Sequence, residues 1–145
     1  MAVVRNFKKK IQSGTAVKTG GSDNLDFTPL AGGVTRYRAE VLMMESPVSS
    51  AKAARMLAEC VVASDGTAAG TRFVTAMAGA TNPASASNAT ASQAQASEFT
   101  GVSPSTLVWS HVGGTTTIRL TVTNNDTSND AFYVMEVDYF EWIAA

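Results

Sequence analysis

Alternation of apolar and polar side chains in the C-terminal third constrains the fold more than any other feature of this sequence. Within residues 115–123, Ile118, Leu120 and Val122 alternate with threonines and an arginine. Residues 131–143 continue the rhythm, and their inward set is Tyr133, Met135, Val137 and Tyr139. A repeat of two is typical of strands with one face buried and one face wet. The polar residues 124–130 between these runs predict a turn.

The same rhythm appears earlier in the chain. Residues 35–45 place Tyr37, Ala39, Val41 and Met43 on one side. Shorter apolar runs at 25–28 and 107–109 are bounded by Pro, Gly and Ser, which end strands. About seven short strands with Gly- and Asn-rich turns predict an all-β, antiparallel β-sandwich of the jelly-roll kind. We expect one sandwich domain over residues 25–145.

Residues 51–62 are ambiguous. Their Ala, Arg, Met, Leu and Glu content favours a helix by intrinsic propensity. The segment nevertheless ends in two valines and leads through a turn into another strand-like run. A strand fits this neighbourhood better and would put Met56, Ala58, Cys60 and Val62 on one face. We predict a strand and keep the helix as the alternative.

Residues 76–98 are of low complexity, almost all Ala, Ser, Thr, Asn, Gln and Gly. A segment with so few apolar side chains cannot bury enough surface to form a core element. We expect a long loop, either held by a partner or a disordered linker.

Residues 1–24 are interpreted as an extended N-terminal arm, because glycines at 14, 20 and 21 interrupt any long element. A short strand over 2–11 is an alternative within it. The candidate partner contacts of the arm are apolar or basic: Val3, Val4, Phe7, Lys8, Lys9 and Lys10. The lysines would pair with an acidic protein surface or with a nucleic-acid backbone, or else lie in a solvated turn.

The final strand adds three further candidate contacts, Val134, Phe140 and Trp142. They fall on the face opposite the inward set. Large apolar residues on a second face indicate either a second packed layer or a subunit interface, and the sequence leaves both open.

Catalytic, metal and cofactor sites are not expected. His111 is the only histidine and Cys60 the only cysteine, so a multi-histidine or cysteine-built metal site cannot form. We expect His111 to be an exposed or hydrogen-bonded loop residue and Cys60 a small buried hydrophobe. With 11 basic against 12 acidic residues and no long apolar run, neither nucleic acid nor a membrane is an expected partner.

The order of segments resembles small β-sandwich domains of tailed-bacteriophage virion proteins. The residues that carry the resemblance are TRYRAEVLMM, then AARMLAECVVASDGTAAG with TRFVTAM, TLVWS, and the closing TTIRLTVTNNDTSNDAFYVMEVDYFEW. It covers about residues 25–143. The resemblance implies a non-enzymatic homotrimer that lies on the capsid surface after assembly in the host cytoplasm.

Two functions follow from this resemblance. The first is a capsid decoration, or cement, protein that binds and stabilises the shell of major capsid protein through its arm. The alternative is a tail-fibre or attachment domain that binds host surface polysaccharide through its loops. An enzyme such as a glycan hydrolase is disfavoured, because no paired acids or activated nucleophile stand out.

Overall fold

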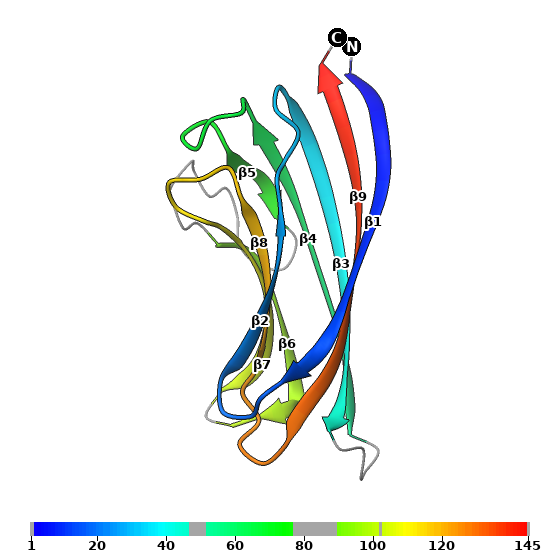
Figure 1. Ribbon diagram of the computed structural model, residues 1–145, viewed down its shortest axis with the longest axis vertical. Helices are drawn as coiled ribbons and strands as arrows, with labels where there is room; N and C mark the ends of the chain where they lie inside the picture. Colours follow the sequence, from blue (N-terminus) through cyan, green and yellow to red (C-terminus); the bar gives the residue numbers. More distant parts are fainter. Residues whose placement is uncertain (1, 47–51, 77–89, 102, 145) are drawn as a thin grey trace.

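Two antiparallel β-sheets face each other as the layers of a sandwich (Figure 1). The computed structural model describes residues 2–46, 52–76, 90–101 and 103–144. The strands in this part of the chain are β1 (Ala2–Ala16), β2 (Gly21–Phe27), β3 (Gly33–Ser46), β4 (Ala53–Ser64), β5 (Arg72–Ala76), β6 (Thr90–Thr100), β7 (Pro104–His111), β8 (Ile118–Asn124) and β9 (Asp130–Ala144). The prediction of an all-β antiparallel sandwich is confirmed.

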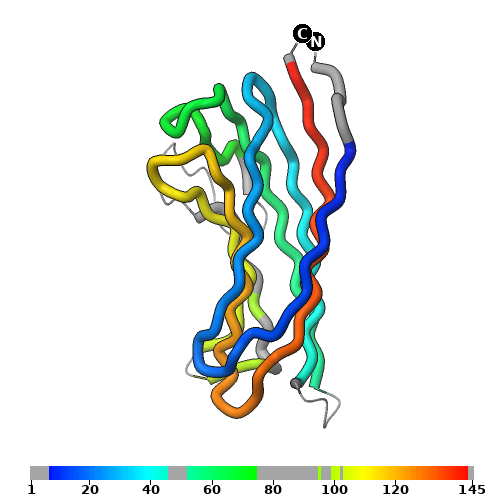
Figure 2. The backbone as a smooth tube through the Cα atoms, in the orientation of Figure 1, coloured from blue at the N-terminus to red at the C-terminus, as the bar shows by residue number. Residues whose placement is uncertain are grey.

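The larger sheet has the order β1-β9-β3-β4-β5 and the smaller sheet β2-β8-β7-β6. Two meanders, β3-β4-β5 and β6-β7-β8, supply the middle of the chain. The first two and last two strands instead form a ribbon, in which β1 pairs with β9 and β2 with β8. This ribbon passes from one sheet to the other (Figure 2). β1 begins beside the end of β9, where Ala2 pairs with Ala144.

The core lies between the sheets and consists of the residues that the period of two points inward. On the larger sheet the buried residues include Tyr37, Val41, Met56, Tyr133 and Met135. On the smaller sheet they include Phe27, Leu107, Trp109, Ile118 and Leu120. The inward sets predicted for residues 35–45 and 118–122 are confirmed. Of the set predicted for residues 131–143, Tyr133, Met135 and Val137 are buried, and Tyr139 is partly buried against the core.

Residues 53–64 form a strand, so the helical alternative for this segment is wrong. β4 pairs with β3 along its whole length, and Met56, Ala58, Cys60 and Val62 are buried. Cross-strand partners and a buried face therefore outweigh helix propensity here.

The expected N-terminal arm is a strand of the sandwich instead. β1 pairs with β9 from Ala2↔Ala144 to Ala16↔Ala131, with one bulge between Val4 and Asn6. The alternative of a short strand over residues 2–11 was closer, although the strand extends to Ala16. Most of its described side chains, from residue 7 onward, bury little surface, but pairing with β9 satisfies the backbone groups on one side of the strand.

The loop expected over residues 76–98 is a strand in part. Residues 90–98 belong to β6, which pairs with β7, and Phe99 is fully buried. Residues 77–89 lie outside the described residues.

The turn between β1 and β2 carries backbone strain at Thr19. Thr19 has φ 64°, followed by Gly20 at φ 94°. A β-branched residue is unfavourable in this left-handed region, whereas glycine and asparagine tolerate it. At Gly21 an added Cβ would lie 2.3 Å from the carbonyl oxygen of Val17, so only glycine fits there.

Replacing Thr19 with asparagine is expected to raise the free energy of unfolding by about 1 kcal/mol, because it relieves this strain. Urea denaturation would measure the change, with Thr28→Asn as the control at another exposed threonine. An unchanged or lower stability for Thr19→Asn would contradict the strain assigned to this turn.

Candidate functional site

The two outward faces of the sandwich differ in chemistry. Of the eight large hydrophobic side chains that are exposed in the described chain, all but Val17 lie on the outward face of the five-stranded sheet. They are Phe7, Ile11, Leu42, Met44, Leu57, Val74 and Phe132. Exposed apolar side chains that gather on one face are typical of protein-interaction sites. We call this face the outer face of the larger sheet.

The opposite face, on the four-stranded sheet, is polar. Arg119 of β8 forms a bidentate ion pair with Asp26 of β2, at 2.8 and 3.0 Å. This guanidinium lowers the pKa of the Asp26 carboxyl. Beside the pair, the hydroxyl of Thr121 donates to Oδ1 of Asn24 at 2.8 Å. Side chains that bond to one another in this way suit a solvated face.

A belt of charges crosses the middle of the outer face of the larger sheet. Its cations are Lys9, Arg36, Arg38 and Arg55, and its anions are Glu40, Glu59, Glu136 and Asp138. Apolar side chains lie on both sides of the belt, with Phe140 and Trp142 towards the chain ends and Leu42, Met44 and Phe132 towards the other end. Several belt residues also line a shallow hollow in this face.

Every charge in the belt has a partner of opposite sign. The ammonium of Lys9 lies 2.6 Å from Glu136 and 3.7 Å from Asp138. Glu59 receives Arg36 at 3.0 Å and Arg38 at 3.2 Å. Arg55 pairs with Glu40. The belt is therefore neutral as a whole, since four cations face four anions.

Part of the predicted contact set meets at one place on this outer face. The ring of Phe7 packs against Phe140, with centroids 4.9 Å apart, and Phe140 stacks on Trp142 at 6.0 Å. Val134 lies on the same face, beyond the charged belt. These last-strand residues thus lie outside the core of the sandwich. For Val3 and Val4 the structure describes the backbone, which pairs with Ile143 and Trp142; their side chains lie outside the described part.

The three predicted lysines have partners within the chain. Lys8 forms an ion pair with buried Glu141 at 3.2 Å. Lys10 donates to the carbonyl oxygen of Asp26 at 3.0 Å, and its ammonium lies 5.0 Å from the centre of the Phe27 ring. Together with Lys9 they lie in a strand, so the solvated-turn alternative is wrong.

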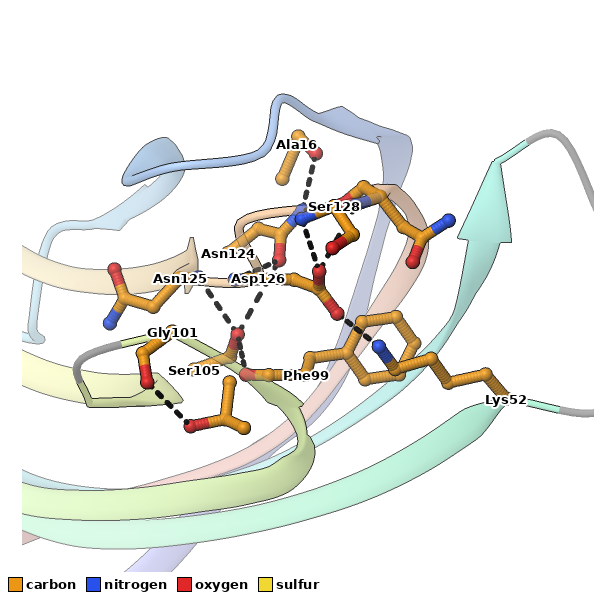
Figure 3. A network of polar contacts seen from close by, with 11 residues as sticks. Ala16, Lys52, Phe99, Gly101, Ser105, Asn124, Asn125, Asp126 and Ser128 are labelled. Atoms are coloured by element: carbon orange, nitrogen blue, oxygen red, sulfur yellow. Dashed lines mark hydrogen bonds and ion pairs between the residues drawn. The ribbon is translucent and has the colours of Figure 1, made fainter.

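A second polar cluster joins the two sheets where β8 turns into β9 (Figure 3). Fully buried Asn124 donates to the carbonyl oxygens of Ala16 and Asn129, each at 3.0 Å, and accepts from the amide of Asp126 at 3.0 Å. Asp126 in turn accepts from the amides of Ser128 and Asn129. These bonds hold the β1–β2 corner against the β8–β9 corner.

Lys52 completes this cluster by pairing with buried Asp126, and its ammonium lies 5.3 Å from the centre of the Phe99 ring. Burial by itself raises the pKa of the Asp126 carboxyl. The hydrogen bonds from Lys52 and from the amides of Ser128 and Asn129 outweigh it, so the pKa is lowered. The carboxylate is thus stabilised in its charged form by groups of the chain itself, which makes the cluster a structural joint.

Neither single residue considered for chemistry forms a reactive constellation. His111 is buried at the end of β7 and bonds through Nε2 to the carbonyl oxygen of Thr115 at 2.6 Å, so it is hydrogen-bonded but not exposed. Cys60 is buried as predicted, and burial raises the pKa of its thiol. Among the described residues, no three His, Cys, Asp or Glu side chains are placed to hold a metal ion. No helix in this part of the chain could span a membrane.

Sequence reasoning missed most of the outer face. Leu42 and Met44 stood in the outward register of residues 35–45, and Leu57 stood in that of residues 53–62. That register was the available signal for these three residues. Ile11 carried no such signal, because its face depends on the pairing of β1 with β9.

Comparison with known proteins found no relative. No protein-family model matches the sequence, and neither a curated protein nor a solved structure matches it.

Proposed function

We propose that this protein is a structural component of a tailed-bacteriophage virion, a capsid decoration protein that binds the shell of major capsid protein as a homo-oligomer. The observation that carries a binding role is the contrast between the two faces of the sandwich. One face exposes apolar side chains around a paired belt of charges, whereas the other is polar. A surface of the first kind is typical of a protein whose function is to be held against other proteins.

The phage setting rests on the order of segments in the sequence. The segments that resemble phage virion domains correspond to β3, β4 with β5, β7, and β8 with β9. They therefore make up most of the two sheets. The sandwich that they form supports the same general architecture, and the crossing ribbon of β1-β2 and β8-β9 supports a jelly-roll-like subtype.

Contact with the shell is assigned to the edge strand β1. It is the outermost strand of the larger sheet and spans 15 residues. An edge strand offers backbone donors and acceptors to which another chain can add a strand. Lys10 and Gln12 donate hydrogen bonds to carbonyl oxygens of β2. The part of β1 near residues 10–12 is therefore occupied by contacts within the chain. Residues 2–7 remain as the contact segment, which retains the predicted role of Val3, Val4 and Phe7.

Shell binding tests this function. Purified protein added to empty shells of the major capsid protein should bind saturably and raise the melting temperature of the shells by several degrees, because a ligand of the folded state stabilises it. A variant lacking residues 2–6 should keep its far-UV circular dichroism but bind at least about tenfold more weakly. A variant lacking residues 144–145, at the same end of the sandwich, is the matched control.

Saturable binding to host cells without affinity for shells would contradict this proposal and favour the attachment domain. Full shell binding by the variant lacking residues 2–6 would contradict the role of β1 alone.

A further inference from the structure

We infer that the outer face of the larger sheet is the surface on which a second copy of this chain packs, face to face, about a two-fold axis running along the strands. This assignment goes beyond shell binding, since it concerns the protein alone in solution. It accounts for both features of the face, the exposed apolar residues and the neutral belt of charges.

The area of the face is sufficient for a stable pair. β9 has 15 residues, which at ~3.4 Å per residue span ~50 Å. Four strands, β1, β9, β3 and β4, are spaced by ~4.8 Å and cover a width of ~19 Å. The product, about 950 Å², is comparable with the ~800 Å² per partner that standard protein interfaces bury.

The charges divide the face into two halves of opposite sign. On β1 and β9, Lys9 is outnumbered by Glu136 and Asp138. On β3 and β4, the three arginines of the belt outnumber Glu40 and Glu59. A two-fold axis along the strands lays the β1–β9 half of one copy over the β3–β4 half of the other. The acidic half of each copy then meets the basic half of its partner.

The central row of the face is complementary to itself under this rotation. Register places Lys9, Asp138, Arg38 and Glu59 side by side across the four strands, in that order. The rotation reverses the order in the second copy. Lys9 then faces Glu59 of the second copy, and Asp138 faces Arg38 of the second copy. Because the charges alternate in sign along the row, each of the four side chains faces a charge of opposite sign.

Each neighbouring row adds favourable contacts of another kind. In one of them Ile11 lies over Leu57 of the second copy, which joins two exposed apolar side chains. In the other, Phe140 lies over Arg36 of the second copy, an arrangement suited to a cation–π contact. Stacked sheets are rotated by about 30°, so the match is best in these central rows, while both ends of the face are apolar.

Other two-fold arrangements of the two faces match less well. A two-fold axis across the strands can lie between the central row and the row that contains Ile11 and Glu136. It places Asp138 over Glu136 of the second copy and Lys9 over Ile11 of the second copy. The axis along the strands has one unfavourable kind of contact, Glu136 over Glu40 of the second copy, which occurs twice in a symmetric pair. Each of these carboxylates keeps its own cation, Lys9 or Arg55. Since the belt is paired before association, burying it leaves no charge without a partner.

Oligomeric mass tests this surface without shells. Light scattering after gel filtration should give the mass of two chains of 15.1 kDa each. Arg38→Glu sets two like charges against each other twice in a symmetric pair, and so does Asp138→Arg. Each variant alone is expected to raise the dissociation constant at least about 100-fold, about tenfold for each repulsive contact.

Mixing the two variants gives the sharpest result. In a mixed pair, the new glutamate faces the new arginine and the unaltered Asp138 faces the unaltered Arg38, so dimers should return. Circular dichroism of each variant alone confirms its fold. Arg119→Glu, which alters a paired arginine on the opposite face, should leave the dimer intact.

Three outcomes would overturn the assignment: a monomer at all concentrations, failure of the mixture to restore dimers, or the mass of three chains, as the phage resemblance implies. A monomer would also contradict the homo-oligomeric state in the proposed function. None of the three outcomes bears on binding to the shell, so the two-fold pair and shell binding can fail separately.

Discussion

Replacing Trp109 with alanine is expected to lower the free energy of unfolding by about 3–5 kcal/mol, the range for removing a large buried aromatic side chain. Trp109 is fully buried on β7 of the smaller sheet. Its ring lies 5.2 Å from that of Tyr37 on the larger sheet and 5.7 Å from Phe27. Its indole N–H donates to the carbonyl oxygen of Ala58 on β4, 3.3 Å away. One side chain thus joins both layers.

Urea denaturation would measure this effect. Domains of this size have total stabilities of about 5–15 kcal/mol, so Trp109→Ala removes a large share and some preparations will be partly unfolded. Trp109→Phe keeps an aromatic ring but loses the hydrogen bond to Ala58, and a smaller loss of about 1–2 kcal/mol is expected. A loss below about 1 kcal/mol for Trp109→Ala would show that the sheets do not pack through this ring.

Replacing Asn124 with alanine is expected to cost about 3 kcal/mol, although the change removes few atoms. The carbonyl oxygens of Ala16 and Asn129 would lose their donor, and the amide of Asp126 would lose its acceptor. Each buried polar group left without a partner costs about 1–3 kcal/mol. Partial access of water keeps the expected total near the lower end of the sum.

Asn125→Ala is the matched control for this corner. Asn125 is partly exposed, and its amide group donates to the carbonyl oxygen of Pro104 at 3.0 Å, so a loss of about 1 kcal/mol is expected. Hydrogen exchange gives a second readout, because Asn124→Ala should abolish protection at the amide of Asp126 while core amides stay protected. Equal losses for the two variants would contradict the assignment of Asn124 as the joint between the corners.

The alternation of side chains was enough to identify the core strands. Tyr37, Val41, Leu120 and Met135 are buried as predicted, because a strand with one wet face and one dry face imposes a repeat of two on its own sequence. Within residues 51–62, where propensity favoured helix, the same repeat was the better guide to the strand that begins at Ala53.

Segments without that repeat were misjudged. β1 exposes Phe7 and Ile11 on one side, while Lys8 and Lys10 point between the sheets. No amphipathic pattern results, and the segment was taken for an arm. β6 is similar, since its backbone pairs with β7 and its sequence of small polar residues shows no repeat of two. Both strands are held by backbone pairing to a neighbour, and such pairing leaves little trace in a single sequence.

By itself, the sequence determined that this chain folds as antiparallel strands and which face of most of them is buried, because burial acts on each side chain locally. Only the tertiary structure decided which strands are neighbours, and therefore that Lys9, Asp138, Arg38 and Glu59 form one row. Those residues are far apart along the chain, and register between distant strands depends on the packing of the whole sandwich. The surface proposed for the second copy is a product of that register.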